Sequence, residues 1–330
     1  MATEPALSQD QRPTCSYSGC RDTCDHEQNF CFWHNPHADK SGDDIAGRLE
    51  ELVRDGRSLE GFQLARANLK GLRLVPKIMD ARVDLSKVNL YRADLRGAHL
   101  YKANLRQASL LKADLTGANL NFADLSFANL LGVKLDDSRM EHVQWGKILF
   151  QEQELKQGFI GHNPSRQLEL YGEAEEVCRS VRRSCEAHGL FDEAGYFFHK
   201  EMTLRRKQYP LGSWQRWMSK LVDVLCGYGE RPFRVFIFSS GLVLMCAMFY
   251  FMVGLGSGGE IIRFEFQVPW YTNVSNFLDA LYFSVVTFTT LGYGDLIPLG
   301  PSRTMAAMEA FIGNFTLALF VVVFVKKMTR

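Results

Sequence analysis

A leucine, or a residue that stands in for it, recurs at every fifth position between residues 57 and 147. The series comprises Leu59, Leu64, Leu69, Leu74 and Met79, then, after a one-residue insertion, Leu85, Leu90, Leu95, Leu100, Leu105, Leu110, Leu115, Leu120, Leu125, Leu130, Leu135, Met140 and Trp145. A period of five fits neither the 3.6-residue repeat of an α-helix nor the two-residue alternation of a β-strand. A short, fixed period over many copies is typical of a solenoid, whose repeats pack only on their neighbours. The sequence therefore predicts a stacked column for residues 57–147.

The residues around these leucines form a consistent string. Alanine or valine stands two places before most of them, and aspartate or asparagine often stands between, as in residues 93–95 and 103–105. This Ala-(Asp/Asn)-Leu-x-x pattern resembles the pentapeptide-repeat proteins. The resemblance implies a right-handed quadrilateral β-helix with one pentapeptide per side and with leucine and alanine inside. Pro76 and the insertion before Leu85 indicate a kink in the early coils, and Trp145 is expected to cap the last coil.

The charge of this region bears on its partners, because some pentapeptide-repeat proteins mimic DNA and such mimicry needs an acidic face. Residues 57–147 instead contain 15 Lys and Arg against 9 Asp and Glu. A basic column suits an anionic partner, although a solvated face is the simpler interpretation of Arg92, Lys102 and Lys112. We therefore expect neither DNA mimicry nor a nucleic-acid partner.

Residues 15–37 contain four potential metal ligands, which are Cys15, Cys20, Cys31 and His34. Cysteines of a cytosolic segment stay reduced, so metal binding is favoured over disulfides. Three thiolates and one imidazole make a complete tetrahedral set for structural zinc, with no open position for catalysis. Cys24 and His26 are alternative ligands. Residues 1–14, which precede the motif, are predicted to be a disordered tail.

Residues 150–210 are predicted to form a helical hairpin. Apolar residues at helical spacing form one stripe on each side of a break at Gly189. Residues 213–228 follow, with Trp214 and Trp217 on one face and Arg216 on the other. This pattern predicts an amphipathic helix at the membrane interface, which either couples the soluble part to the next segment or anchors that segment in the bilayer.

Two apolar segments predict a multi-pass membrane protein. Residues 235–259 carry no charge over 25 positions, and residues 304–325 carry one charge over 22 positions, so spans are expected at 233–256 and 303–326. Lys and Arg gather before the first span and after the second. The positive-inside rule therefore predicts cytoplasmic N- and C-termini in a cell membrane. The polar N-terminal region does not resemble a signal peptide.

Between the spans lies the string Thr290-Leu291-Gly292-Tyr293-Gly294-Asp295. Four copies of a Thr-x-Gly-Tyr-Gly strand can replace the hydration shell of K⁺ with rings of backbone carbonyls. Glycine allows the backbone angles that turn successive carbonyls toward one axis. A pore helix and filter are expected over residues 276–295, with Asn276 as the N-cap and the helix C-terminus directed at the ion path.

At this point residues 230–330 resemble the two-transmembrane potassium channels of the bacterial ion-channel superfamily. The resemblance implies an all-α pore that assembles as a homotetramer around the filter, with K⁺ as the transported ion. Leu291 stands where Val or Ile is commoner, which puts ion preference in question. Gly313 matches the hinge glycine of the family's inner helix, and its alternative role is close packing between membrane helices.

Three further side chains are candidates for supporting the filter. Glu309 is an intramembrane carboxylate and therefore a functional candidate. We expect it to bond to the pore helix or the filter backbone rather than to form an ion site in the cavity. Asp295 is expected to accept a hydrogen bond from Tyr282 on the pore helix.

The sequence therefore favours a tetrameric K⁺-selective channel whose cytoplasmic repeat domain modulates gating. A non-selective cation channel is an alternative, because Leu291 changes the packing behind the filter. A membrane-anchored scaffold that binds a partner through its solenoid is a second alternative. An enzyme is not expected, because no nucleophile–base constellation or nucleotide motif is found in the sequence.

Overall fold

The computed structural model describes residues 13–24, 29–76, 81–156 and 163–329. The chain divides into two compact units, one up to Pro210 and one from Leu211 onward. Residues 1–12 of the predicted tail lie outside the described residues, as do Met79 and His26. Thr14, the last residue of that predicted tail, pairs with Thr23 in an antiparallel β-bridge.

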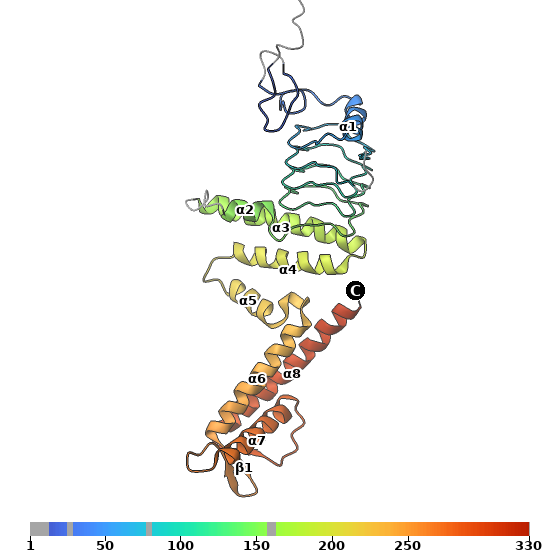
Figure 1. Ribbon diagram of the computed structural model, residues 1–330. Coiled ribbons are helices and arrows are strands. Elements are labelled where there is room, and N and C mark those ends of the chain that lie inside the picture. Colours follow the sequence, from blue (N-terminus) through green and yellow to red (C-terminus); the bar gives the residue numbers. More distant parts are fainter. Residues whose placement is uncertain (1–12, 25–28, 77–80, 157–162, 330) are drawn as a thin grey trace, which may run out of the picture. The chain divides into compact units, whose positions relative to one another are not determined.

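The first unit is built on a column of four-sided coils (Figure 1). Asn89 pairs in parallel with Ser109, and Ser109 pairs with Asn129, so each regular coil takes four pentapeptides. The repeat leucines lie inside and are almost completely buried, as are the alanines two places before them. A stacked column of pentapeptide repeats is thus present over the described part of residues 57–147, with its core filled by the two predicted residue types.

The residue between alanine and leucine shapes the corners of the column. Its side-chain oxygen accepts a hydrogen bond from the backbone N–H two residues later, as from Ser126 to Asp124 at 2.9 Å and from Thr116 to Asp114 at 3.1 Å. Asp and Asn favour such turns because their short side chains can bond to nearby backbone. The preference for Asp or Asn at this position therefore follows from the four turns that each coil must make.

The first coil departs from the predicted spacing. Gln63 pairs with Asn89, whereas the pairs of the column from Asp84 with Asn104 onward join positions one regular coil apart. The pairings of Gln63, Asn68 and Arg73 each span 26 positions of the sequence, and those from Asp84 onward span 20. The first coil is therefore six residues longer than the others, rather than one residue longer. The extra residues fall between Leu74 and Leu85, and Met79, which was expected to continue the repeat there, lies outside the described residues.

Both ends of the column are covered within the first unit. At the start, helix α1 (Asp44–Arg54), which the sequence analysis did not predict, buries Ile45, Leu49 and Val53. At the other end lie α2 (Phe150–Lys156), α3 (Pro164–Ala187) and α4 (Phe191–Gln208). The Ser184 hydroxyl of α3 donates to the carbonyl of Leu135 at 2.8 Å. The predicted hairpin of residues 150–210 thus comprises three helices, and it covers the last coil together with the predicted cap Trp145, whose ring meets Phe197 edge-on.

The second unit begins with the amphipathic helix α5 (Trp214–Cys226) and a short 3₁₀ turn, η2 (Gly227–Gly229). Helix α6 (Pro232–Val253) is followed by strands β1 (Leu255–Ser257) and β2 (Glu260–Ile262), then by α7 (Trp270–Phe288), β3 (Ile297–Pro298) and α8 (Pro301–Met328). The strands form a small antiparallel sheet in the order β2-β1-β3. Helices α6 and α8 are long and apolar enough to cross a membrane.

Candidate ion pathway and metal cluster

The predicted filter follows directly after α7. Thr290, Gly292 and Gly294 have φ angles of 57°, 58° and 82°, whereas Leu291 and Tyr293 between them keep negative φ. Alternating the sign of φ in this way lets successive carbonyl groups turn toward the same side. A positive φ is uncommon for a β-branched residue such as Thr290. All five residues of the predicted filter are exposed in the single chain, so their backbone is accessible from outside the chain.

Helix α7 leads into this segment and is longer than predicted. It begins at Trp270 after Pro269, ahead of the expected N-cap at Asn276. The Asn276 side chain does not cap the helix; it donates to the carbonyl of Arg263 at 2.9 Å. At the other end, the N–H of Leu291 donates to the carbonyl of Val286 at 3.0 Å. The negative end of the helix therefore adjoins the filter, where it favours a cation.

Glu309 of α8 is buried between α6 and α7. Its Oε2 accepts from the Tyr250 hydroxyl of α6 at 2.6 Å, and its Oε1 lies 2.5 Å from the Ser284 hydroxyl of α7. Ser284 also lies 2.9 Å from the carbonyl oxygen of Val243. A hydroxyl carries one proton, so all three contacts are satisfied together only if the Glu309 carboxyl supplies a proton to Ser284. Glu309 thus joins three helices, and it meets the pore helix as expected.

Gly313 lies one turn further along α8, where the helix passes the end of α7. A Cβ atom at this position would lie 2.3 Å from the carbonyl oxygen of Phe288. Only glycine permits this approach, because the atom in the way belongs to the backbone. Helix α8 continues without a break from Pro301 to Met328. The structure therefore gives Gly313 a close-packing role, and its role as a gating hinge stays a prediction.

Asp295 and Tyr282 are brought together by the turn that the filter makes. The Tyr282 hydroxyl of α7 interacts with the Asp295 carboxylate, and Asp295 directly follows the last filter glycine. This is the pairing that the sequence indicated. It links the C-terminal end of the predicted filter to the helix that precedes it.

The second candidate site lies in the first unit, where the donor atoms of Cys15, Cys20, Cys31 and His34 all lie within 4.8 Å of one another. The sulfurs of Cys20 and Cys31 are 3.8 Å apart, and His34 Nδ1 lies 3.2 Å from Cys31 Sγ and 3.7 Å from Cys15 Sγ. A tetrahedron with Zn–S bonds of about 2.3 Å has S–S edges of about 3.8 Å and S–N edges of about 3.5 Å. The four side chains can therefore hold a metal ion of this size.

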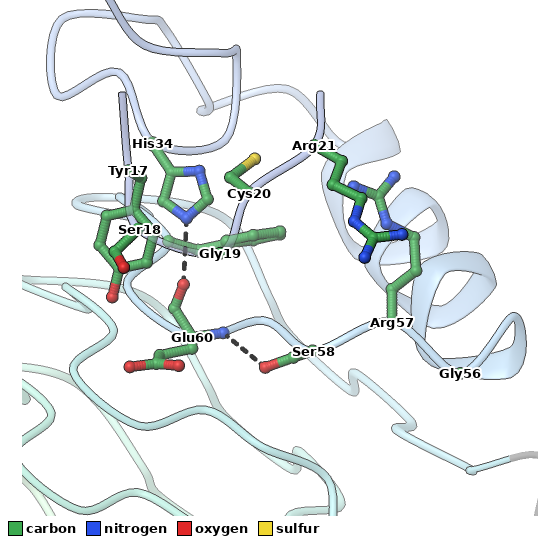
Figure 2. Close-up of a pocket in the computed structure, with 11 residues that line it drawn as sticks. Tyr17, Ser18, Gly19, Cys20, Arg21, His34, Gly56, Arg57, Ser58 and Glu60 are labelled. Carbon is green, nitrogen blue, oxygen red and sulfur yellow. Dashed lines mark hydrogen bonds between the residues drawn. The ribbon is translucent and has the colours of Figure 1, made fainter. Parts of the chain in front are cut away.

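The surroundings of the cluster orient these ligands. His34 Nε2 bonds to the carbonyl oxygen of Glu60 at 3.1 Å, which leaves Nδ1 facing the three sulfurs. The Tyr17 ring stacks on His34 with centroids 4.1 Å apart, and its other contacts include Gly61, where a Cβ would collide with the ring. Figure 2 shows His34, Tyr17 and Glu60 around a cavity of about 450 Å³ beside the cluster.

The thiols of the cluster differ in their electrostatics. Burial raises the pKa of Cys31 to about 12, because a thiolate is poorly solvated there. Burial also raises the pKa of Cys24, which lies near Cys15 but outside the set of four. A bound cation would reverse this penalty by stabilising the thiolates. The four donor atoms that lie together come from Cys15, Cys20, Cys31 and His34, without Cys24.

Sequence reasoning missed several of the residues that complete these sites. Tyr250 and Ser284 gave no signal beyond being polar residues in apolar segments, and their pairing with Glu309 depends on how three helices pack. Glu60 contributes only its backbone carbonyl, which no side-chain pattern can reveal.

Comparison with known families finds matches in the column and in the segment that holds the predicted filter. Residues 238–330 match the ion-channel family, and residues 81–117 and 108–141 match pentapeptide repeats in eight copies. The inward rectifier potassium channel Kirbac3.1 of Paramagnetospirillum magnetotacticum is 43% identical over 56 residues, which are 17% of this chain and 19% of that protein. Two pore potassium channel a of Oryza sativa subsp. japonica is 53% identical over 45 residues, or 13% of each chain. The matched segments thus span less than a fifth of either relative.

Solved structures similar to the chain include pentapeptide repeat proteins. Rfr23 from the cyanobacterium Cyanothece is 30% identical, with a TM-score of 0.19 and a match over 26% of this chain and 57% of that one. HetL, a pentapeptide repeat protein involved in heterocyst differentiation regulation from the cyanobacterium Nostoc, is 33% identical over 24% of this chain and 37% of its own, with a TM-score of 0.14.

The ion-channel match covers most of α6, then α7, the predicted filter and α8, and the repeat match covers the regular coils of the column. Both curated relatives named above are potassium channels. The chain therefore combines a potassium-channel-like ion-channel domain with pentapeptide repeats.

Proposed function

We propose that the chain forms a tetrameric, K⁺-selective channel in the cell membrane, with both termini in the cytoplasm. The observation that carries this proposal is the backbone of Thr290–Gly294, whose alternating φ angles suit a strand that presents its carbonyls to an ion. Four such strands around one axis would supply rings of oxygen ligands for K⁺. The bilayer would surround α6 and α8, and the proposed activity is transport rather than catalysis.

Purified protein in liposomes tests this proposal. Wild-type protein should carry a K⁺ flux, and Gly292→Ala should remove it, because an alanine opposes the positive φ of the filter at that position. Gly241→Ala is the matched control, since a Cβ at Gly241 meets nothing within 4 Å. Absence of flux from the wild-type protein would reject the proposal that the chain forms a channel.

Selectivity for K⁺ over Na⁺ is tested by reversal potentials under bi-ionic conditions. Leu291 is the residue in question, because its large side chain is exposed in the single chain and would pack behind the filter only in an assembly. A reversal potential near zero would contradict K⁺ selectivity and would favour a non-selective cation channel instead. Leu291→Val, which restores the commoner residue, should then shift the reversal potential toward that of K⁺.

We further propose that the first unit modulates the gate. Support comes from the order of the chain, in which the unit that ends at Pro210 leads through α5 into the first span. Deleting residues 1–150 should change the open probability while leaving the unitary conductance unchanged. If both quantities match those of the full chain, the column is a scaffold for a partner rather than a regulator.

Zinc is the proposed occupant of the Cys15, Cys20, Cys31 and His34 cluster, in a structural role. It would neutralise three thiolates and tie the N-terminal loop to the start of the column, where the N–H of Gln63 donates to the carbonyl of Trp33. Elemental analysis should find about one zinc per chain, and Cys31→Ser should abolish it. Cys226→Ser changes a buried cysteine outside the cluster and should leave the zinc content unchanged.

A further inference from the structure

The elbow between α5 and α6 is held in a fixed shape. Gly227, Tyr228 and Gly229 all have positive φ, which turns the chain sharply within three residues. The Tyr228 hydroxyl bonds to the Ser219 hydroxyl of α5 at 2.8 Å. Arg234 of α6 donates to the carbonyl oxygen of Asp223 at 2.7 Å and to its carboxylate at 3.1 Å. Helix α5 and the first turn of α6 are therefore tied together and should move as one piece.

The same elbow contacts the last turns of α8. Lys326 Nζ donates to Glu230 Oε1 at 2.7 Å across 96 residues of sequence. The Glu230 side chain is only 6% exposed, and that of Lys326 is 34% exposed. A Cβ at Gly229 would lie 3.5 Å from Lys326 Nζ, so the elbow leaves little more than the room the ammonium group needs. The two side chains are therefore closely packed and largely shielded from solvent.

An apolar cluster surrounds this pair. Cys226 of α5, Val235 of α6 and Val323 of α8 are buried together, with Leu319 and Phe320 packed against them. Removing one partner of a shielded pair leaves the other charge without compensation, and that loss exceeds the effect of breaking an exposed surface pair. The position of the α8 end relative to the elbow therefore depends on both charges.

We propose that the Glu230–Lys326 ion pair links α5 to the cytoplasmic end of α8 and holds that end outward, in the conducting state. This inference rests on the proposed channel function. In a two-span pore, α8 would line the axis and α6 would lie outside it, so a bond from α8 to the base of α6 draws the α8 end away from the axis. A movement of α5 would then reach the gate through Glu230, while the filter stays unaffected.

Single-channel recording of the full chain in bilayers tests this role. Glu230→Gln and Lys326→Gln should each lower the open-to-closed ratio about tenfold, which corresponds to about 1.4 kcal/mol, with the unitary conductance unchanged. The double exchange Glu230→Lys with Lys326→Glu should restore most of the ratio, which a purely structural loss would not allow. Lys327→Gln removes the same charge one residue later and should have little effect.

The proposal would be overturned by unchanged gating in both single variants, by an equal effect of Lys327→Gln, or by no recovery in the double exchange. A raised open probability would also contradict the outward-holding role. If wild-type protein carries no flux, the channel proposal fails first, and spin labels at Met328→Cys provide a separate measurement. In purified oligomers their distances should shorten in Glu230→Gln and recover in the double exchange, and unchanged distances would reject the link.

Discussion

The column of residues 59–145 repeats the same contacts in each regular coil, whereas residues 238–330, which match the ion-channel family and are called the pore region here, make each of their contacts once. In the column, leucines such as Leu105 and Leu110 lie in equivalent, fully buried positions in successive repeats. In the pore region, Glu309 and Gly313 each meet a partner that has no copy elsewhere in the part of the chain that the structure describes. Repetition spreads stability over many equal contributions, and single contacts concentrate function in a few residues.

The largest expected effect lies in the column. Leu110→Ala should lower the free energy of unfolding of the first unit by about 2–5 kcal/mol, because it empties a fully buried position between two neighbouring coils. Denaturant unfolding followed by circular dichroism measures this change. Leu111→Ala, at the next and only half-buried position, should cost much less. Equal losses at both positions would show that the interior is not the regular core described above.

At Glu309 we expect a smaller effect on stability than at Leu110, but a larger effect on function. Glu309→Leu leaves the Tyr250 hydroxyl without its acceptor and the Ser284 hydroxyl without the proton that it accepts, at about 1–3 kcal/mol each. Flux in liposomes should fall sharply. Glu309→Gln should retain most of the flux, because its amide can donate to Ser284 while its oxygen accepts from Tyr250. Loss of K⁺ selectivity in Glu309→Gln alone would instead indicate an ion site that needs the charge.

Gly313→Ala tests the closest helix contact of the pore region. The added methyl group would meet the carbonyl of Phe288 and should destabilise the pore by about 1–3 kcal/mol, with loss of flux. Thermal stability of the assembly in detergent measures the first effect. If stability is unchanged while the open probability falls, Gly313 acts as a hinge, which would favour the family role over close packing.

The smallest effect concerns two cysteines of α3. Burial raises the pKa of Cys178 and of Cys185 to about 12, so at pH 8 each holds about a thousandfold less thiolate than a free cysteine. Alkylation of the native protein should therefore leave both unmodified until it is unfolded, and their reactivity should rise only as the pH approaches 12. After metal removal, Cys20, which is only half-buried, should react first. Rapid labelling of Cys178 would mean that the hairpin opens readily.

Much of the column could be predicted because its signal is repeated. The period of five, the buried leucines and alanines, and the Asp or Asn of each turn all reappear in the structure. The long first coil could not be placed, since a single insertion interrupts the pattern that would locate it. Helix α1 was missed because its three buried residues, Ile45, Leu49 and Val53, are too few to stand out.

The pore region differs from the column, because its elements could be predicted from specific motifs rather than from a repeated pattern. Its filter string and spans were visible in the sequence because their chemistry is specific, and α6 and α8 end within about three residues of the predicted limits. The start of α7 was placed too late, since Asn276 has the residue type of an N-cap but bonds to Arg263 instead. Contacts such as Tyr250 with Glu309 depend on helix packing, for which one sequence gives no measure.

The four-pentapeptide coil also sets a rule for changing the length of the molecule. Because Asn89, Ser109 and Asn129 lie directly above one another, adding four pentapeptides would lengthen the column by one coil without turning its two ends relative to each other. Adding a single pentapeptide would rotate one end by a quarter turn. The first coil already takes 26 residues rather than 20, and the later coils keep a regular register. The column is thus a spacer whose number of whole coils sets its length and whose leftover pentapeptides set the angle between its ends.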